Sequence, residues 1–190
     1  GPGGWLALDV SNPRSMNLVK RVYEPDLSNP HRTANGLRTA EFREPHSFGL
    51  SEGNNVLIPT GKGVEIWDWS DINNPIQVSK LVIPGVNYGD YTNVAWNVFW
   101  QAPYLYVARS DAGLTIVDTS DLAAPFVVKT VPASELGGFN IGSVYALGNE
   151  MFISSMSGTA GFAILNIDNP TDPRVVREVK SVPEIFYSAC

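Results

Sequence analysis

Two histidines are the side chains of this 190-residue chain best suited to acid–base chemistry or metal binding, because an imidazole can do both near neutral pH. His46 begins a predicted strand and could act as a metal ligand or a general base. A metal site needs several converging donors, however, and the matching places in later segments hold Trp96 and Gly142, neither of which is a ligand. A hydrogen bond from His46 to a neighbouring loop is the favoured interpretation, and His31, in a polar loop, is interpreted as solvent-exposed.

Six aromatic side chains could form a platform on which sugar rings or a proline-rich partner would stack. They are Trp67, Trp69, Tyr88, Tyr91, Trp96 and Trp100. Those that fall in predicted strands, such as Trp96, are interpreted as core residues, because strand aromatics usually fill the space between packed sheets. Tyr88, Asp90 and Tyr91 lie on a glycine-containing loop, where rigid aromatics suit a binding surface. Together with His46, these three are the predicted binding residues.

Acidic and amide side chains are concentrated in two turn-like segments, residues 70–74 and 168–172, whose oxygens could bind calcium. Neither segment has the spacing of a known calcium loop, and Asp, Asn and Pro form turns in any case, so turn formation is favoured. The sequence lacks the phosphate-loop, dinucleotide-binding and zinc-protease motifs, and no pair of carboxylates stands out. We predict no catalytic residues and no cofactor, with calcium or a channel metal as open alternatives.

The overall composition is that of a globular chain, with 44% hydrophobic and 17% charged residues. The net charge of −6 at pH 7 argues against binding to nucleic acid or to an anionic membrane surface. The one cysteine, Cys190, allows no internal disulfide and no cysteine-based zinc site. Since no apolar run approaches the ~18 residues of a membrane-spanning helix, no membrane span is predicted.

An internal repeat organises the chain. Residues 4–11, 63–70, 113–120 and 161–168 each read glycine, large apolar, any residue, aliphatic, apolar, Asp or Asn, any residue, and Ser or Asp. A proline stands seven residues past the Asp or Asn in the last three copies, where the first copy has Met16, and a valine stands ten residues past it in every copy. These residues are Pro75, Pro125 and Pro173, and Val19, Val78, Val128 and Val176. Successive copies lie roughly 50 residues apart, close to the length of a propeller blade.

Each copy predicts a strand, a polar turn and a second strand, because apolar residues alternate with period two, and its glycine marks the preceding hairpin. The predicted turn residues, whose short side chains can accept hydrogen bonds from backbone amides, are Asp9, Asp68, Asp118 and Asn166. Two more strands are predicted upstream of each later copy, over residues 46–50 and 56–58, 93–100 and 104–108, and 142–147 and 151–154. The repeat therefore has four strands.

Residues 114–118 (Leu-Thr-Ile-Val-Asp) and 64–68 (Val-Glu-Ile-Trp-Asp), each followed by Ser and then by Ala-Pro or Asn-Pro, resemble the LVIVD repeat. The resemblance extends over nearly the whole chain, with departures at Met16 and Asn166. It implies a β-propeller of a kind found largely in exported or surface-associated microbial proteins, and hence an extracellular, periplasmic or cell-surface location. The motif is specific for a fold and not for an activity.

The predicted fold is therefore all-β, a partial β-propeller with about three and a half four-stranded blades. Residues 1–22 supply the outer strands of a first blade and 23–45 a loop excursion, while 46–82, 83–131 and 132–179 form the second to fourth blades and 180–190 start another. Propellers close with typically about four to eight blades, so we expect the remaining blades to come from a longer chain or a partner subunit, or two copies of the chain to meet edge to edge. The abrupt ends favour a longer chain, of which this sequence would be a fragment.

Two functions fit this fold. In the favoured one the chain is a non-catalytic binding or scaffold module that binds a protein or a glycan through its loops or its channel mouth, because blade architecture leaves few residues unexplained. In the alternative it is a propeller enzyme or enzyme subunit with a metal or carboxylates at the central channel, which His46 would line from the innermost strand of its blade.

Overall fold

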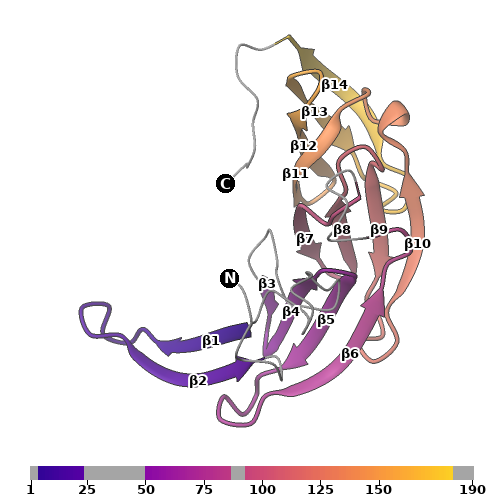
Figure 1. Ribbon diagram of the computed structural model, residues 1–190. Coiled ribbons are helices and arrows are strands. Elements are labelled where there is room, and N and C mark those ends of the chain that lie inside the picture. The colour runs from indigo at the N-terminus through magenta and orange to yellow at the C-terminus, as the bar shows by residue number, and fades with distance from the viewer. Residues whose placement is uncertain (1–3, 24–49, 87–92, 182–190) are drawn as a thin grey trace, which may run out of the picture.

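The computed structural model describes residues 4–23, 50–86 and 93–181, which form strands and one short 3-10 helix. The strands make four antiparallel sheets, one of two strands and three of four strands. Figure 1 shows these sheets side by side along an arc, with β3, β7 and β11 nearest its centre and β2, β6, β10 and β14 at its outer margin. Sheets that follow one another around a common centre in this way are the blades of a β-propeller.

We call these sheets the first to fourth blades, in chain order. The first blade consists of β1 (Gly4–Asp9) and β2 (Asn17–Tyr23). The second blade consists of β3 (Leu50–Glu52), β4 (Asn55–Thr60), β5 (Gly63–Asp68) and β6 (Ile76–Val82). The third blade consists of β7 (Asn97–Gln101), β8 (Tyr104–Ala108), β9 (Leu114–Asp118) and β10 (Phe126–Val131). The helix η1 (Ala133–Glu135) leads to the fourth blade, which consists of β11 (Asn140–Leu147), β12 (Glu150–Ser157), β13 (Gly161–Asn166) and β14 (Arg174–Lys180).

The prolines of the repeat each lie one residue before the outermost strand of a complete blade. Pro75 precedes β6, Pro125 precedes β10 and Pro173 precedes β14. Because proline has no N–H to donate, this position costs the sheet no ladder hydrogen bond. The outermost strand also carries a β-bulge against its neighbour in all four blades, so the repeat extends to the irregularities of pairing.

The apolar core lies between neighbouring blades. Along β8, Leu105 and Val107 face the second blade, whereas Tyr106 and Ala108, which alternate with them, face the fourth blade. The exposed fraction of all four side chains is 0%. A strand covered on both faces has no solvent-facing position, which explains why the run from Tyr104 to Ala108 contains no charged residue.

A close approach of two strands explains the glycine of the repeat. A Cβ atom on Gly63 would lie 2.1 Å from the carbonyl oxygen of Leu81, and one on Gly113 would lie 2.1 Å from that of Val131. Any larger residue would therefore push the third strand of the blade away from the fourth. The glycine serves this contact as well as the hairpin that the sequence predicts.

One predicted strand begins later in the structure than the sequence predicts. β7 begins at Asn97 and not at residue 93, and Val94 and Trp96 pack with Met156 in a small separate cluster. Of the strand predicted over residues 46–50, only Leu50 lies within the described residues, in β3, whereas His46 lies outside them.

Candidate ligand-binding rim

Half of the turns in the described blades lie along one edge of the arc, because antiparallel strands bring the chain back to the same edge at every second turn. This edge, which we call the turn rim, carries the hairpins β3–β4, β7–β8 and β11–β12. It also carries the turns that follow β1, β5, β9 and β13. The hydrogen bonds of the turns described next lie on the turn rim.

The side chain that ends β1, β5, β9 or β13 holds the turn that follows. In all four blades its Oδ1 atom accepts a hydrogen bond from the backbone N–H two residues later. The acceptors are Asp9 (2.9 Å), Asp68 (2.7 Å), Asp118 (2.8 Å) and Asn166 (3.1 Å). Hydrogen bonds from the hydroxyl and the backbone N–H of Ser70 lower the pKa of the Asp68 carboxyl, because they stabilise its ionised form.

A second side chain, three residues further on, repeats this arrangement in every blade. Its Oδ1 atom accepts from the backbone N–H two residues later, and its own carbonyl oxygen accepts from the N–H three residues later. These residues are Asn12, Asp71, Asp121 and Asn169. Two successive Asx turns fix the course of each loop without any partner from outside it. This second position was not singled out from the sequence, although Asp or Asn occupies it in every copy.

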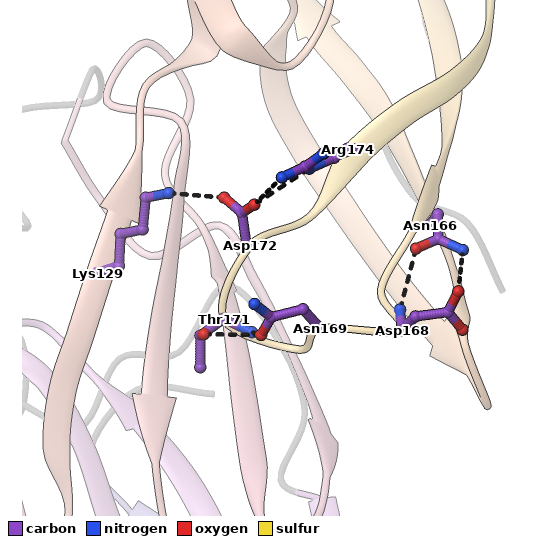
Figure 2. Close-up of polar contacts among 7 residues, drawn as sticks. All are labelled: Lys129, Asn166, Asp168, Asn169, Thr171, Asp172 and Arg174. Carbon is purple, nitrogen blue, oxygen red and sulfur yellow. Dashed lines mark hydrogen bonds and ion pairs between the residues drawn. The ribbon is translucent and has the colours of Figure 1, made fainter.

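The turn of the fourth blade also contacts the third blade. Figure 2 shows Asp172 between two cations, with Lys129 Nζ of β10 3.1 Å from Oδ1 and the guanidinium of Arg174 2.9 Å from Oδ2. Arg174 and Lys129 therefore lower the pKa of the Asp172 carboxyl. In the same turn, Asn166 Nδ2 donates to Asp168 Oδ2 at 2.8 Å. The Lys129–Asp172 pair joins two blades at the rim.

A cavity of about 240 Å³ lies on the turn rim between the second and third blades. Glu52 and Asn55, at the two ends of the β3–β4 hairpin, line it from the second blade. Trp100, Pro103 and Leu122 line it from the third blade. An indole, a pyrrolidine ring and an aliphatic side chain thus share one small space with a carboxylate and an amide, which is the mixture typical of small-molecule sites.

The orientation of Trp100 is fixed by its neighbours in the third blade. Its Nε1–H donates to Thr119 Oγ1 at 3.0 Å, and that hydroxyl donates to the carbonyl oxygen of Pro103 at 2.6 Å. The backbone N–H of Thr119 donates to the same carbonyl at 2.8 Å. Because the Trp100 side chain is half-buried and also packs on the core between the two blades, its ring is preorganised in the cavity wall.

The other tryptophans of the aromatic group take different places. Trp67 and Trp96 are buried, with exposed fractions of 8% and 7%. Trp67 Nε1 donates to Glu65 Oε2 at 3.0 Å, and this carboxylate is itself only 2% exposed. Trp100 was interpreted from the sequence as one more strand aromatic of the core. Its place next to the end of β7, just before a turn, is the signal that distinguishes it.

The predicted binding residues His46, Tyr88, Asp90 and Tyr91 lie outside the described residues, so their role stays a prediction. In residues 4–23, 50–86 and 93–181, no three His, Cys, Asp or Glu side chains are grouped so that they could hold a metal ion. That part of the chain also contains no helix long and apolar enough to cross a membrane.

Comparison with known families agrees with the repeat seen here. The family model of the LVIVD repeat matches residues 3–24 and 94–132, which contain the strands of the first and third blades. These two stretches match the LVIVD repeat. The predicted all-β propeller fold is thereby confirmed. The second and fourth blades lie outside the matched stretches, yet they have the same paired Asx turns as the two matched LVIVD repeats.

Solved structures similar to this chain include the N-terminal domain of Nup159 and an S. cerevisiae complex of Dbp5 with Nup159, Gle1, IP6 and ADP. In both cases the TM-score is 0.45 and the sequence identity 13%, over 72% of this chain and 30% of the other. The chain therefore spans less than a third of the length of the chains it matches. No curated protein matches the sequence.

Proposed function

We propose that this chain is a non-catalytic binding module, exported or surface-associated, which binds a protein or a glycan through its turn rim. The observation that carries the proposal is the cavity beside Trp100, which lies between two blades and is flanked by turns that their own side chains hold in place. The wall of this cavity comes from two blades and forms only when they pack side by side in the propeller, whereas each turn can form within a single blade.

Preorganisation of the rim supports this role. Binding to a mobile loop costs about 0.5–1.5 kcal/mol for each side chain that must be ordered. Here the Asx turns around Asp68 and Asp118 and the hydrogen-bonded indole of Trp100 are already in place before any ligand arrives. The export of the protein is supported by the LVIVD repeat, which occurs largely in exported or surface proteins.

We also propose that further blades, from a longer chain or a partner subunit, cover the outer face of the fourth blade. Tyr145 and Leu147 on this face are 44% and 72% exposed, and with Phe152 and Ile164 they line an apolar cavity of about 210 Å³. The corresponding faces of the second and third blades are covered by the blade that follows. Such a large apolar surface is costly to leave in water, which supports a covering sheet.

The binding proposal is tested with two matched charge reversals of exposed glutamates. Glu52→Arg changes the cavity on the turn rim, and Glu135→Arg changes η1 at the opposite edge of the blades. Fluorescently labelled protein is titrated onto surface material from the cells that make it. We expect saturable binding that Glu52→Arg weakens by about tenfold, or about 1.4 kcal/mol, and that Glu135→Arg leaves within about twofold.

Treatment of the same surface material tells the two ligand classes apart. Loss of binding after protease digestion indicates a protein, and loss after periodate oxidation indicates a glycan. Absence of saturable binding would refute the proposal of a binding module. Equal binding by both variants would show that the binding surface is not on the turn rim.

A further inference from the structure

We propose that the cavity beside Trp100 binds one pyranose ring of a glycan, an inference that rests on the proposed binding function and names its ligand. The cavity lies between the β3–β4 hairpin of the second blade and two segments of the third blade, the β7–β8 hairpin and the turn that follows β9. Its size, its aromatic wall, its free polar groups and its place in the repeat all bear on the ligand.

The size of the cavity selects a single ring. Sites for drug-sized ligands enclose about 300–1,000 Å³, and the volume here is about 240 Å³. An extended ligand could therefore place only one ring-sized group inside. A terminal or branching sugar residue presents such a group, with the rest of the glycan left in solvent.

The aromatic wall suits the apolar face of a sugar. The indole of Trp100 lines the cavity, and its hydrogen bond to Thr119 fixes the orientation of the ring. The C–H groups of a pyranose ring carry partial positive charge and are attracted to the negative face of an aromatic ring, as the edges of other aromatic rings are. Leu122 and Pro103 add apolar contact beside the indole.

Two polar side chains of the second blade are available to ring hydroxyls. The side-chain amide of Asn55 makes no hydrogen bond with any described residue, and neither does the exposed carboxylate of Glu52. Asn55 can donate two hydrogen bonds and accept others, while Glu52 accepts only. A hydroxyl-bearing ring satisfies both kinds of group, whereas the proline ring of a polypeptide ligand offers them no polar partner.

The next junction along the chain has a larger residue at the equivalent position. Asn55 and Tyr104 are equivalent, because each begins the second strand of its blade and pairs with the Asp of the repeat. Tyr104 is half-buried and packs on the core between the third and fourth blades. Nearby, Gln101 Nε2 donates to the carbonyl oxygen of Gly148 at 2.8 Å and ties those blades together. The second blade thus has the smaller Asn, which lines the cavity, where the third blade has Tyr.

This comparison supplies a blocking variant and its control. Asn55→Tyr fills the cavity beside Trp100 with the side chain found at the equivalent position of the next junction, where Ala146 stands in place of Trp100. Glu150→Tyr adds the same side chain at the equivalent position of the fourth blade, where Glu150 pairs with Asn166 and is exposed. Glu52→Gln, a change on an exposed side chain, keeps the cavity open but removes the charged acceptor.

The experiment records two-dimensional NMR spectra of ¹⁵N-labelled protein during titration with the methyl glycosides of glucose, galactose, mannose and N-acetylglucosamine. We expect at least one glycoside to shift the Trp100 indole N–H and the Asn55 side-chain amide signals with one common binding curve. Asn55→Tyr should weaken that binding by about tenfold or more, Glu52→Gln by about threefold, and Glu150→Tyr should leave it unchanged.

Three results would overturn the sugar site. They are no saturable shift with any glycoside, a shift that persists undiminished in a folded Asn55→Tyr protein, and an equal shift of the Trp100 signal with an oligoproline peptide. If the wild-type protein still binds surface material while the glycosides fail, only the sugar site is wrong. If surface binding is absent as well, the proposed function fails with it.

Discussion

Tyr106 is a fully buried tyrosine whose hydroxyl makes no hydrogen bond with any described residue. Leaving such a group unpaired in a protein interior costs about 1–3 kcal/mol, because the water it bonded to in the unfolded chain is not replaced. Tyr106→Phe removes the hydroxyl and keeps the ring that packs between the third and fourth blades. We therefore expect this variant to be more stable than the wild type, by about 1–2 kcal/mol at neutral pH.

The same residue predicts how stability responds to high pH. Burial, with a smaller contribution from Tyr104, raises the pKa of Tyr106 from 10.0 to about 12. Between these values the unfolded chain releases this proton and the folded chain keeps it, so rising pH favours unfolding. One pH unit corresponds to about 1.4 kcal/mol, which gives a loss of roughly 2–3 kcal/mol for the wild type by pH 12. Tyr106→Phe lacks this part of the loss, so the difference between the two proteins should widen above pH 10.

Urea denaturation followed by tryptophan fluorescence measures both effects as changes in midpoint at constant slope. Tyr145→Phe is the control, because it removes a hydroxyl from a side chain that is 44% exposed and should leave the midpoint unchanged. A Tyr106→Phe protein that is less stable than the wild type by about 1 kcal/mol would refute the reasoning, since it would mean that the hydroxyl is paired in solution.

Other parts of the repeat give three further predictions. Gly113→Ala should lower the free energy of unfolding by at least about 2 kcal/mol in thermal denaturation, because Gly113 has φ +88° and a Cβ would lie 2.1 Å from the Val131 carbonyl oxygen. The pKa of Asp168 is lowered by hydrogen bonds from two asparagine side chains, so its stabilising effect is present above about pH 4 and is lost as pH falls. Asp168→Asn should therefore reduce the acid sensitivity of stability, measured by denaturation between pH 5 and 2. Lys129→Met removes the exposed pair with Asp172 and should lower stability slightly at low salt and not at all at high salt.

Local features of the fold follow from the sequence because they depend on residues close together in the chain. The Asp or Asn that ends each strand and the proline before the outermost strand mark a turn of fixed length, and both lie where the spacing predicts. The packing reason for the repeat glycine could not be predicted in this way, since Gly113 lies close to the carbonyl oxygen of Val131, in a strand that follows a long turn. Such a contact becomes visible only when the strands are paired.

The candidate site depends on contacts between blades and was therefore harder to predict. Trp96 and Trp100 lie four residues apart in one aromatic segment, yet one is buried and the other lines a cavity. Trp96 packs with Met156 of the fourth blade, whereas Trp100 lines a cavity with Asn55 of the second blade, and no periodicity within the aromatic segment contains that information. Tyr88, Asp90, Tyr91 and His46 remain predictions of the loops outside the described residues.

The repeat constrains some positions far more than others, and this difference bears on where function can arise. The four turns keep one hydrogen-bonding pattern with either a carboxylate or an amide, because the backbone N–H needs only a short side-chain oxygen. Positions between blades pack instead against residues of the adjacent blade, and these residues differ from one junction to the next. Trp100 corresponds to Ala146 in the fourth blade, as each lies one residue before the end of its pairing with the next strand. At the junction of the second and third blades, the large ring of Trp100 is combined with the small Asn55. At the next junction, the small Ala146 is combined with the large Tyr104, so the large and small residues exchange places. The first arrangement leaves the Asn55 amide and the Glu52 carboxylate beside the indole of Trp100, and the proposal of a ligand site between the second and third blades rests on this difference.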